Sequence, residues 1–208
     1  MIAGADRAVF LDRDGVINEL VADPASGRPE SPYRAEDVAL TPGAVEALRV
    51  LRTLAVPLVV VSNQPSAAKG TATIADLMRV HEAVMALLAD AGVGVDDVRY
   101  CFHHPDGVHP DLGRACDCRK PLPGLIHQAA AALGLDDAAL GRSWLIGDSD
   151  VDVEAARAAG CSTVLVDEPR SAHRRRGARA DRSAPDVLED ARIVAAAVPA
   201  PVPGEEAG

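Results

Sequence analysis

VFLDRDGVIN, residues 9–18, is an apolar run of strand type that ends in two carboxylates, Asp12 and Asp14. A strand ending at Asp12 can hold one carboxylate rigidly at the carboxyl edge of a sheet, and a turn at Gly15 can bring Asp14 back toward the same pocket. Such a pair suits phosphoryl transfer, because one carboxylate can attack while the other moves a proton. Taken alone, Asp-x-Asp after a strand is also typical of an ordinary polar loop.

The rest of the chain alternates short β-branched runs with helix-patterned stretches. This alternation predicts an α/β fold with a Rossmann-like parallel sheet and helices on both faces. Strands are expected at residues 8–12, 57–62, 98–101, 143–147 and 162–166, with a short last one at 186–188. Helices are expected to begin at Thr41-Pro42-Gly43, at Thr73, at Pro123 and near Val151. Aromatic residues make up only 2% of the chain, so the core should be aliphatic.

The length of 208 residues fits one domain, which we place at residues 1–190. The ending VPAPVPGEEAG is typical of disorder, so residues 191–208 are predicted to form a disordered C-terminal tail. Two long irregular stretches are residues 19–34, a candidate active-site flap, and the cysteine-containing loop 103–119. A basic stretch from His173 to Arg182 is interpreted as a solvated loop without a catalytic role, with an anion site as the alternative.

The formal net charge of −10 disfavours nucleic acid as a partner and favours a small-molecule substrate. The N-terminus lacks the basic start and long apolar stretch of a signal peptide, and no apolar run reaches membrane-spanning length. We therefore expect a cytoplasmic protein without a membrane partner, and a monomer rather than an oligomer.

Residues 12–18, DRDGVIN, resemble the first motif of the haloacid dehalogenase (HAD) superfamily, Asp-x-Asp-Gly-x-x-Asn. Three more segments resemble the remaining superfamily motifs in the same order: VVVSNQ at 59–64, RKP at 119–121 and LIGDSDVD at 145–152. Four such segments in one order favour the HAD interpretation over four unrelated polar loops. The resemblance implies a magnesium-dependent phosphatase with an aspartyl-phosphate intermediate.

The same resemblance implies a role for each motif residue. Asp12 would be the nucleophile, and Asp14 would be general acid and then general base, with its pKa raised by the nearby negative charges. Ser62 and the main-chain N–H of Asn63 would bind a phosphoryl oxygen. Lys120 would neutralise charge between the nucleophile and the phosphate.

For magnesium, the resemblance implies oxygen ligands from three residues. Asp148 would bind Mg²⁺ together with a side-chain oxygen of Asp12 and the main-chain carbonyl of Asp14. Asp152 would lie outside this ligand set and support it.

Three of the four cysteines lie between residues 101 and 118, and clustered thiols in a reducing compartment indicate metal rather than a disulfide. The candidate zinc ligands are Cys101, His103, Cys116 and Cys118. Four protein ligands close a tetrahedral site, so this zinc would be structural. His104 or His109 could replace His103, and the other interpretation is a set of reduced, buried cysteines. Cys161 stands apart and is interpreted as packing.

The cysteine loop narrows the resemblance. A Cys-x-His…Cys-x-Cys-Arg-Lys-Pro loop in a capless HAD-like phosphatase looks like the D,D-heptose 1,7-bisphosphate phosphatases and their histidinol-phosphate phosphatase relatives, over roughly residues 8–167. This implies D-glycero-D-manno-heptose 1,7-bisphosphate as substrate, which would lose its 7-phosphate, with Arg119 binding the sugar or the distal phosphate.

Three features depart from that family's usual pattern on the leaving-group side. Ser149 stands where a lysine is often found, Pro65-Ser66 replaces the commoner Ser-Gly, and the stretch 19–34 is longer than expected. Histidinol phosphate or another small phosphate ester is the alternative substrate. A non-catalytic ligand-binding module of the same fold is the alternative of a different class.

Overall fold

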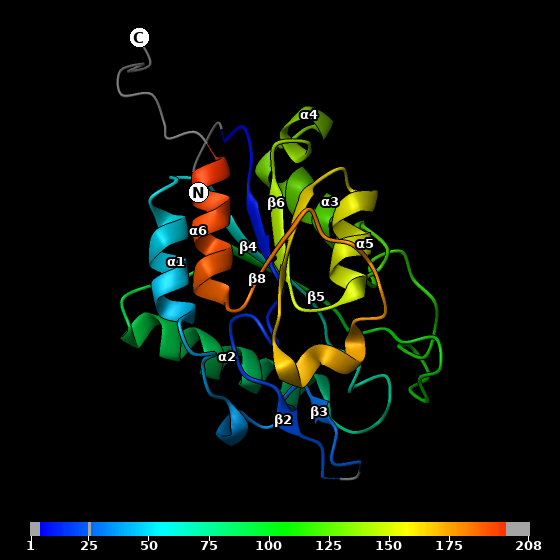
Figure 1. The fold of residues 1–208 in the computed structure, drawn as a ribbon. Helices are drawn as coiled ribbons and strands as arrows, with labels where there is room; N and C mark the ends of the chain where they lie inside the picture. The colour runs from blue at the N-terminus through cyan, green and yellow to red at the C-terminus, as the bar shows by residue number, and fades with distance from the viewer. Residues whose placement is uncertain (1–4, 25, 199–208) are drawn as a thin grey trace.

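The computed structural model describes residues 5–24 and 26–198. Its centre is a six-stranded parallel sheet in the order β5-β4-β1-β6-β7-β8 (Figure 1). The strands are β1 (Val9–Leu11), β4 (Leu58–Asn63), β5 (Asp97–Cys101), β6 (Trp144–Gly147), β7 (Ser162–Val166) and β8 (Arg182–Ala184). The first five confirm the predicted strands to within one or two residues at their ends. β8 lies at the end of the basic stretch that the sequence predicts to be a loop.

Successive strand side chains point to opposite faces of the sheet, and each face has its own apolar cluster. On one face Val9, Leu11 and their neighbours pack against α1 (Ala44–Arg52), α2 (Ile74–Asp90) and α6 (Val187–Ala197). On the other, Phe10 and its neighbours pack against α3 (Gly124–Leu133), α4 (Asp137–Leu140) and α5 (Asp150–Ala158). Figure 1 shows these two helical layers on either side of the sheet. The α/β fold class is therefore confirmed, with a mainly aliphatic core.

Helix boundaries follow local chemistry. Thr73 and Asp76 form a reciprocal capping box at the start of α2, and Gly134 ends α3 with a φ of 71°. The expected start at Thr41 is three residues too early. Gly43 has a φ of 83°, which a helix does not accommodate, so Thr41 and Pro42 lie in a preceding turn and α1 begins at Ala44.

The C-terminal region differs from both predictions made for it. Residues 186–188 begin a helix rather than a strand, because the Asp186 side chain accepts a hydrogen bond from the Glu189 amide as an N-cap. The predicted tail also begins too early, since Ala191 and Val194 are fully buried on α6. The remainder of that tail, residues 199–208, lies outside the described residues.

A small antiparallel hairpin, β2 (Val21–Ala22) and β3 (Pro29–Glu30), extends from the lower end of the sheet in Figure 1. The 3-10 helix η2 (Pro169–Arg174) lies beside it, joined by the ion pairs Arg170–Glu19 at 2.8 Å and Arg174–Glu30 at 3.1 Å. A second 3-10 helix, η1 (Ala35–Asp37), follows the hairpin. Within the described residues no helix is both long and apolar enough to span a membrane.

Candidate active site

Three neighbouring strands deliver the motif residues to one edge of the sheet. β1 is followed by Asp12, β4 contains Ser62, and β6 is followed by Asp148. Because the strands are parallel, their carboxyl ends meet at one edge. A cavity of about 630 Å³ opens there, lined by six of the predicted residues: Asp12, Asp14, Ser62, Asn63, Arg119 and Lys120. Asp148 is fully buried beside Asp12 and Asp152.

Lys120 is a buried cation held between two carboxylates. Its Nζ lies 2.9 Å from Asp12 Oδ1 and 2.5 Å from Asp152 Oδ1, and donates to the Val61 carbonyl at 2.8 Å. Burial alone lowers the pKa of Lys120, but the two carboxylates raise that pKa above its ordinary value. The amine therefore stays charged next to Asp12.

The Asn63 side chain fixes the position of Lys120 rather than reaching the cavity freely. Its amide donates to the Lys120 carbonyl at 3.0 Å and accepts from the Lys120 amide at 3.0 Å. Asp152 supports the site from behind, because it accepts hydrogen bonds from both Lys120 and Ser149. This is the supporting position that the sequence suggests for Asp152.

Asp12 lies in a strongly negative environment. Burial, followed by the charges of Asp152 and Asp14, raises its pKa to about 6, although Lys120 opposes this shift. Its Oδ1 also accepts a hydrogen bond from the Arg13 amide at 2.8 Å. The carboxylate is fixed in place, and further positive charge nearby would favour its ionised form.

Asp14 corrects the expectation of a raised pKa. Burial raises the pKa of this carboxyl, but the Arg13 guanidinium and hydrogen bonds from Asn18 and Gln64 outweigh it and lower the pKa. Arg13 donates to both oxygens, at 2.9 and 3.1 Å, and the Asn18 and Gln64 amides add contacts at 2.9 and 2.6 Å. The negative neighbours are present, yet these donors hold Asp14 as a carboxylate.

Neither Arg13 nor Gln64 is among the residues to which the motifs give a role. Arg13 is fully buried, and its guanidinium lies 5.4 Å from the centroid of the Tyr100 ring. The Tyr100 hydroxyl is in turn 2.9 Å from His81 Nδ1, at the edge of α2. An arginine between two motif aspartates is a signal for a contact with Asp14, but Tyr100, the aromatic residue that Arg13 also contacts, is 87 residues away in sequence.

Asp148 has the properties of a cation ligand. Within the described residues neither of its buried oxygens has a hydrogen-bond partner, and burial together with Asp12 and Asp152 raises its pKa well above the ordinary value. Ligand oxygens of these three carboxylates lie within 4.8 Å of one another, and oxygen donors are what Mg²⁺ prefers. Two cations oppose this raised pKa of Asp148, namely Arg174 at the cavity rim and Lys120, which contacts Asp12 and Asp152 directly.

Gly15 makes the approach of Asp148 possible. Its φ is +89°, and a Cβ at this position would lie 2.2 Å from Asp148 Oδ2. A side chain here would collide with the carboxylate. The residues present therefore fit a magnesium ion beside Asp12 and Asp148.

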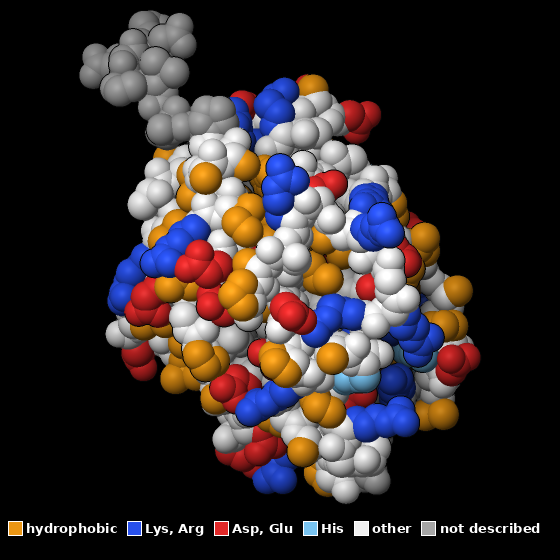
Figure 2. All heavy atoms as spheres, in the orientation of Figure 1, with side chains coloured by type: hydrophobic (Ala, Val, Ile, Leu, Met, Phe, Trp, Pro, Cys, Tyr) orange, Lys and Arg blue, Asp and Glu red, His pale blue; other side chains and the backbone are white. Residues whose placement is uncertain are grey.

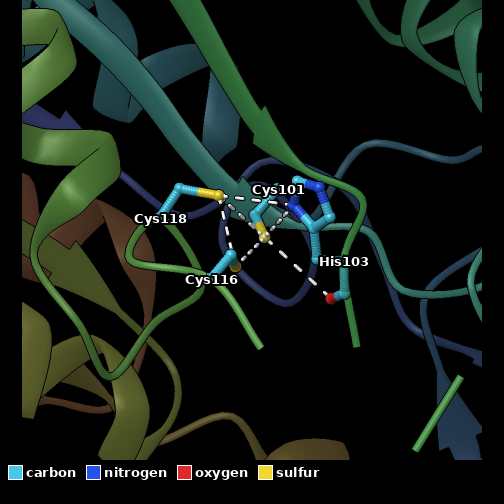
Figure 3. Close-up of side chains that lie close together, drawn as sticks. All are labelled: Cys101, His103, Cys116 and Cys118. Atoms are coloured by element: carbon cyan, nitrogen blue, oxygen red, sulfur yellow. Dashed lines mark hydrogen bonds between the residues drawn. The ribbon is translucent and has the colours of Figure 1, made fainter. Parts of the chain in front are cut away.

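The four cysteine-loop residues also converge (Figure 3). The sulfur atoms of Cys101, Cys116 and Cys118 are 3.2–3.6 Å apart, and His103 Nδ1 lies 3.8 Å from Cys101 and 3.6 Å from Cys118. A zinc tetrahedron with bonds of about 2.3 Å has ligand separations of about 3.8 Å. The donor set and its dimensions fit zinc.

The two other candidate histidines point elsewhere. His104 Nδ1 accepts a hydrogen bond from the Asp106 amide, and His109 Nδ1 accepts one from the Asp111 amide. Cys161 is buried in the apolar cluster shared by α3 and α5. The structure therefore groups His103 with the three loop cysteines. Since Arg119 and Lys120 follow Cys118 directly, this cluster also anchors two cations of the cavity.

The cavity rim contains basic residues for which the sequence predicts no catalytic role. His173, Arg174 and Arg176 line the cavity, whereas the leading prediction for this stretch is a solvated loop. Glu30 and Ser31 line it as well, so part of the predicted flap borders the site. No spacing rule indicates these residues, because only the packing of η2 against the hairpin brings them to the cavity.

Comparisons with known proteins agree with this geometry. The family model for HAD-hydrolase-like proteins matches residues 117–191. The chain is 36% identical to the D-glycero-β-D-manno-heptose-1,7-bisphosphate 7-phosphatase of Yersinia pestis, over 76% of this chain and 79% of that one. It is 32% identical to the D-glycero-α-D-manno-heptose-1,7-bisphosphate 7-phosphatase of Photorhabdus laumondii, over 79% of this chain and 86% of that one.

Among solved structures, D,D-heptose 1,7-bisphosphate phosphatase from B. bronchiseptica, complexed with magnesium and phosphate, superposes with a TM-score of 0.73. The identity is 29%, and the match covers 90% of this chain and 97% of that one. The parallel sheet, the motif residues at its carboxyl edge and these relatives lead to one conclusion: this chain belongs to the HAD-like phosphatase family that contains the D-glycero-D-manno-heptose-1,7-bisphosphate 7-phosphatases.

Proposed function

We propose that this phosphatase is magnesium-dependent and converts D-glycero-D-manno-heptose 1,7-bisphosphate to the heptose 1-phosphate through an aspartyl phosphate. The observation that supports this most strongly is the arrangement of Asp12, Lys120 and Asp148. A fixed carboxylate contacts a buried cation, and a second carboxylate with no hydrogen-bond partner among the described residues lies beside it. The names of the relatives, and the large share of each chain that the matches cover, support the choice of sugar.

In the proposed mechanism a carboxylate oxygen of Asp12 attacks phosphorus, and the bond from phosphorus to the sugar oxygen breaks. Asp14 gives its proton to that oxygen and later takes a proton from the water that hydrolyses the acyl phosphate. Arg13 opposes protonation of Asp14, whereas an incoming phosphate dianion would favour it. Ser62, the Asn63 amide and Lys120 would bind phosphoryl oxygens.

Two metals complete the proposal. Mg²⁺, held by Asp12, Asp148 and the Asp14 carbonyl, would supply positive charge that stabilises the transferring phosphoryl group. Zn²⁺, held by Cys101, His103, Cys116 and Cys118, would be structural. Its position in the loop would set the direction of Arg119 and Lys120.

The functional form is proposed to be a cytoplasmic monomer that acts on a small molecule rather than on nucleic acid. The net charge of −10 supports a small-molecule substrate over nucleic acid. Size-exclusion chromatography with light scattering on the full chain tests whether it is a monomer. A stable dimer at micromolar concentration would contradict it.

A substrate panel tests the proposed reaction. The full chain, with zinc and magnesium supplied, is assayed on both anomers of the heptose bisphosphate, on sugar monophosphates, on histidinol phosphate and on an aryl phosphate. The highest kcat/KM is expected for a heptose bisphosphate, with activity lost on magnesium removal. A higher value for histidinol phosphate would reassign the substrate, and no turnover of any ester would favour a binding module.

A further inference from the structure

The cavity rim carries two arginines that the proposed chemistry does not use. Arg174 ends η2 and Arg176 follows it, and both line the cavity together with the N-terminal end of α5. In the view of Figure 2, Lys and Arg side chains gather on the face over η2 and to its right, with a histidine among them. The overall charge of −10 makes a local basic surface at the site unusual for this chain.

The backbone directs these two side chains to the same side. Arg175 is extended, with φ −105° and ψ 112°, and in extended chain alternate residues share a face. The Arg175 guanidinium turns back into its own segment, where it donates to the Glu168 carbonyl at 2.9 Å and to the Asp167 carboxylate at 2.8 Å. Arg175 therefore holds this segment in place, while Arg174 and Arg176 line the cavity.

A second contact fixes the segment against the active site. The Arg176 amide donates to Asp150 Oδ2 at 2.5 Å, in the first turn of α5. That turn directly follows Asp148 and Ser149. The arginines consequently hold a defined position beside the magnesium-binding residues instead of lying on a free loop.

One of the two arginines already binds an anionic group. Arg174 contacts the Glu30 carboxylate of the hairpin at 3.1 Å, with its side chain 22% exposed. Within the described part of the chain the Arg176 guanidinium has no ionic partner, although it lines the same cavity. The rim thus presents one paired and one unpaired guanidinium, and the paired one is held by a carboxylate that is itself half exposed.

We propose that Arg174 and Arg176 bind the second phosphate of a bisphosphate substrate, the one that is not hydrolysed, and that this phosphate displaces Glu30 from Arg174. The assignment rests on the proposed function. Planar guanidinium groups suit bidentate contact with phosphate oxygens, and a dianionic phosphate offers more charge than a single carboxylate. Arg174 and Arg176 would be specificity-determining residues, because they bind the phosphate that does not react.

The test compares two substrates that have the same scissile phosphate ester at C7 and differ only in the 1-phosphate, heptose 1,7-bisphosphate and heptose 7-phosphate. In the double variant Arg174→Ala/Arg176→Ala, kcat/KM for the bisphosphate should fall by about 10- to 100-fold more than for the monophosphate, mainly through KM. Glu30→Gln should act in the opposite direction and lower KM for the bisphosphate, since it frees Arg174. A purely structural role of the arginines would affect both substrates equally.

Two variants serve as matched controls. Arg182→Ala removes one positive charge outside the cavity, and Arg170→Ala removes the other ion pair between η2 and the hairpin. Each should change both substrates by the same factor. If the wild type prefers the bisphosphate and the double variant keeps that preference, the phosphate site is wrong while the proposed function stands. If the wild type hydrolyses other esters but neither heptose phosphate, the proposed function itself fails and the phosphate site with it.

Discussion

The carboxylate cluster and the cysteine cluster are both groups of buried ligand atoms, but the fold builds them in different ways. Asp12 and Asp148 follow neighbouring strands, so the ladder of the sheet fixes their separation. Among the cysteine ligands only Cys101 belongs to a strand, and the other three lie in the irregular stretch 103–118. The sheet would hold the first cluster without metal, whereas we expect the second to require the proposed zinc to hold the loop.

The largest effect is expected from Asp12→Asn, which tests the carboxylate cluster directly. Turnover should fall by about 10⁴-fold or more, because an amide cannot replace the carboxylate nucleophile. The fold should persist, since the sheet does not depend on this charge, and circular dichroism checks that point. Wild-type-like rates in a correctly folded variant would refute the covalent route.

Gly15→Ala is expected to have the next largest effect. It places a Cβ 2.2 Å from Asp148 Oδ2, so Asp148 must move, and activity should drop by about 100-fold with a higher magnesium requirement. Gly27→Ala is the matched control, because its φ is +67° but no atom lies within 4 Å of the new Cβ. Magnesium titrations of both variants separate the collision from backbone strain. Equal behaviour of the two would contradict the role of Gly15.

Cys116→Ser tests the cysteine cluster. Loss of one ligand should abolish stoichiometric zinc and lower the melting temperature by several degrees, because bound metal contributes folding free energy. Activity should fall less than in Asp12→Asn, since Lys120 is also held by Asn63 and Asp152. Metal analysis and thermal unfolding measure both effects. Cys161→Ala, outside the cluster, should leave the zinc content unchanged.

The smallest effect concerns a buried carboxylate that belongs to neither cluster. Burial, together with the charge of Asp186, raises the pKa of Asp190 on α6 to about 8. The folded state therefore binds this proton more tightly than the unfolded state, and the ionised group costs stability increasingly as the pH rises from about 4 to 8. Asp190→Asn removes that cost.

The expected gain in unfolding free energy for Asp190→Asn is thus larger at pH 8 than at pH 5, by about 1–3 kcal/mol. Urea unfolding at the two pH values measures it. A gain that is independent of pH would show that Asp190 does not titrate in this range. Asp186→Asn tests the second cause of the raised pKa separately, because asparagine removes the charge but can still cap α6.

Sequence patterns predict many residues of the active site. Resemblance to the four family motifs indicated the carboxylates, Ser62, Lys120 and Asp148, because each motif is a short segment that can be compared locally. The cysteine spacing likewise selected the three cysteines together with His103, with His104 and His109 as alternatives to that histidine. In each case the signal lay within a few residues of the chain.

Contacts between distant segments could not be found in this way. The lowered pKa of Asp14 depends on how Arg13 turns toward it and on the approach of Gln64 from β4. Arg174 and Arg176 reach the cavity because η2 packs against the hairpin, more than 140 residues earlier in sequence. The helix at 187–197 had an apolar spacing that the proline-rich ending obscured.

By itself, the sequence determined the positions of the first five strands, the residue types available in the two clusters and the aliphatic core, since these follow from residue type and local periodicity. Only the tertiary structure decided the charge state of Asp14, which histidine joins the cysteines, and which arginines face the cavity. Those properties depend on distances between segments, and electrostatic and hydrogen-bond energies change steeply over a few ångströms that sequence spacing does not specify.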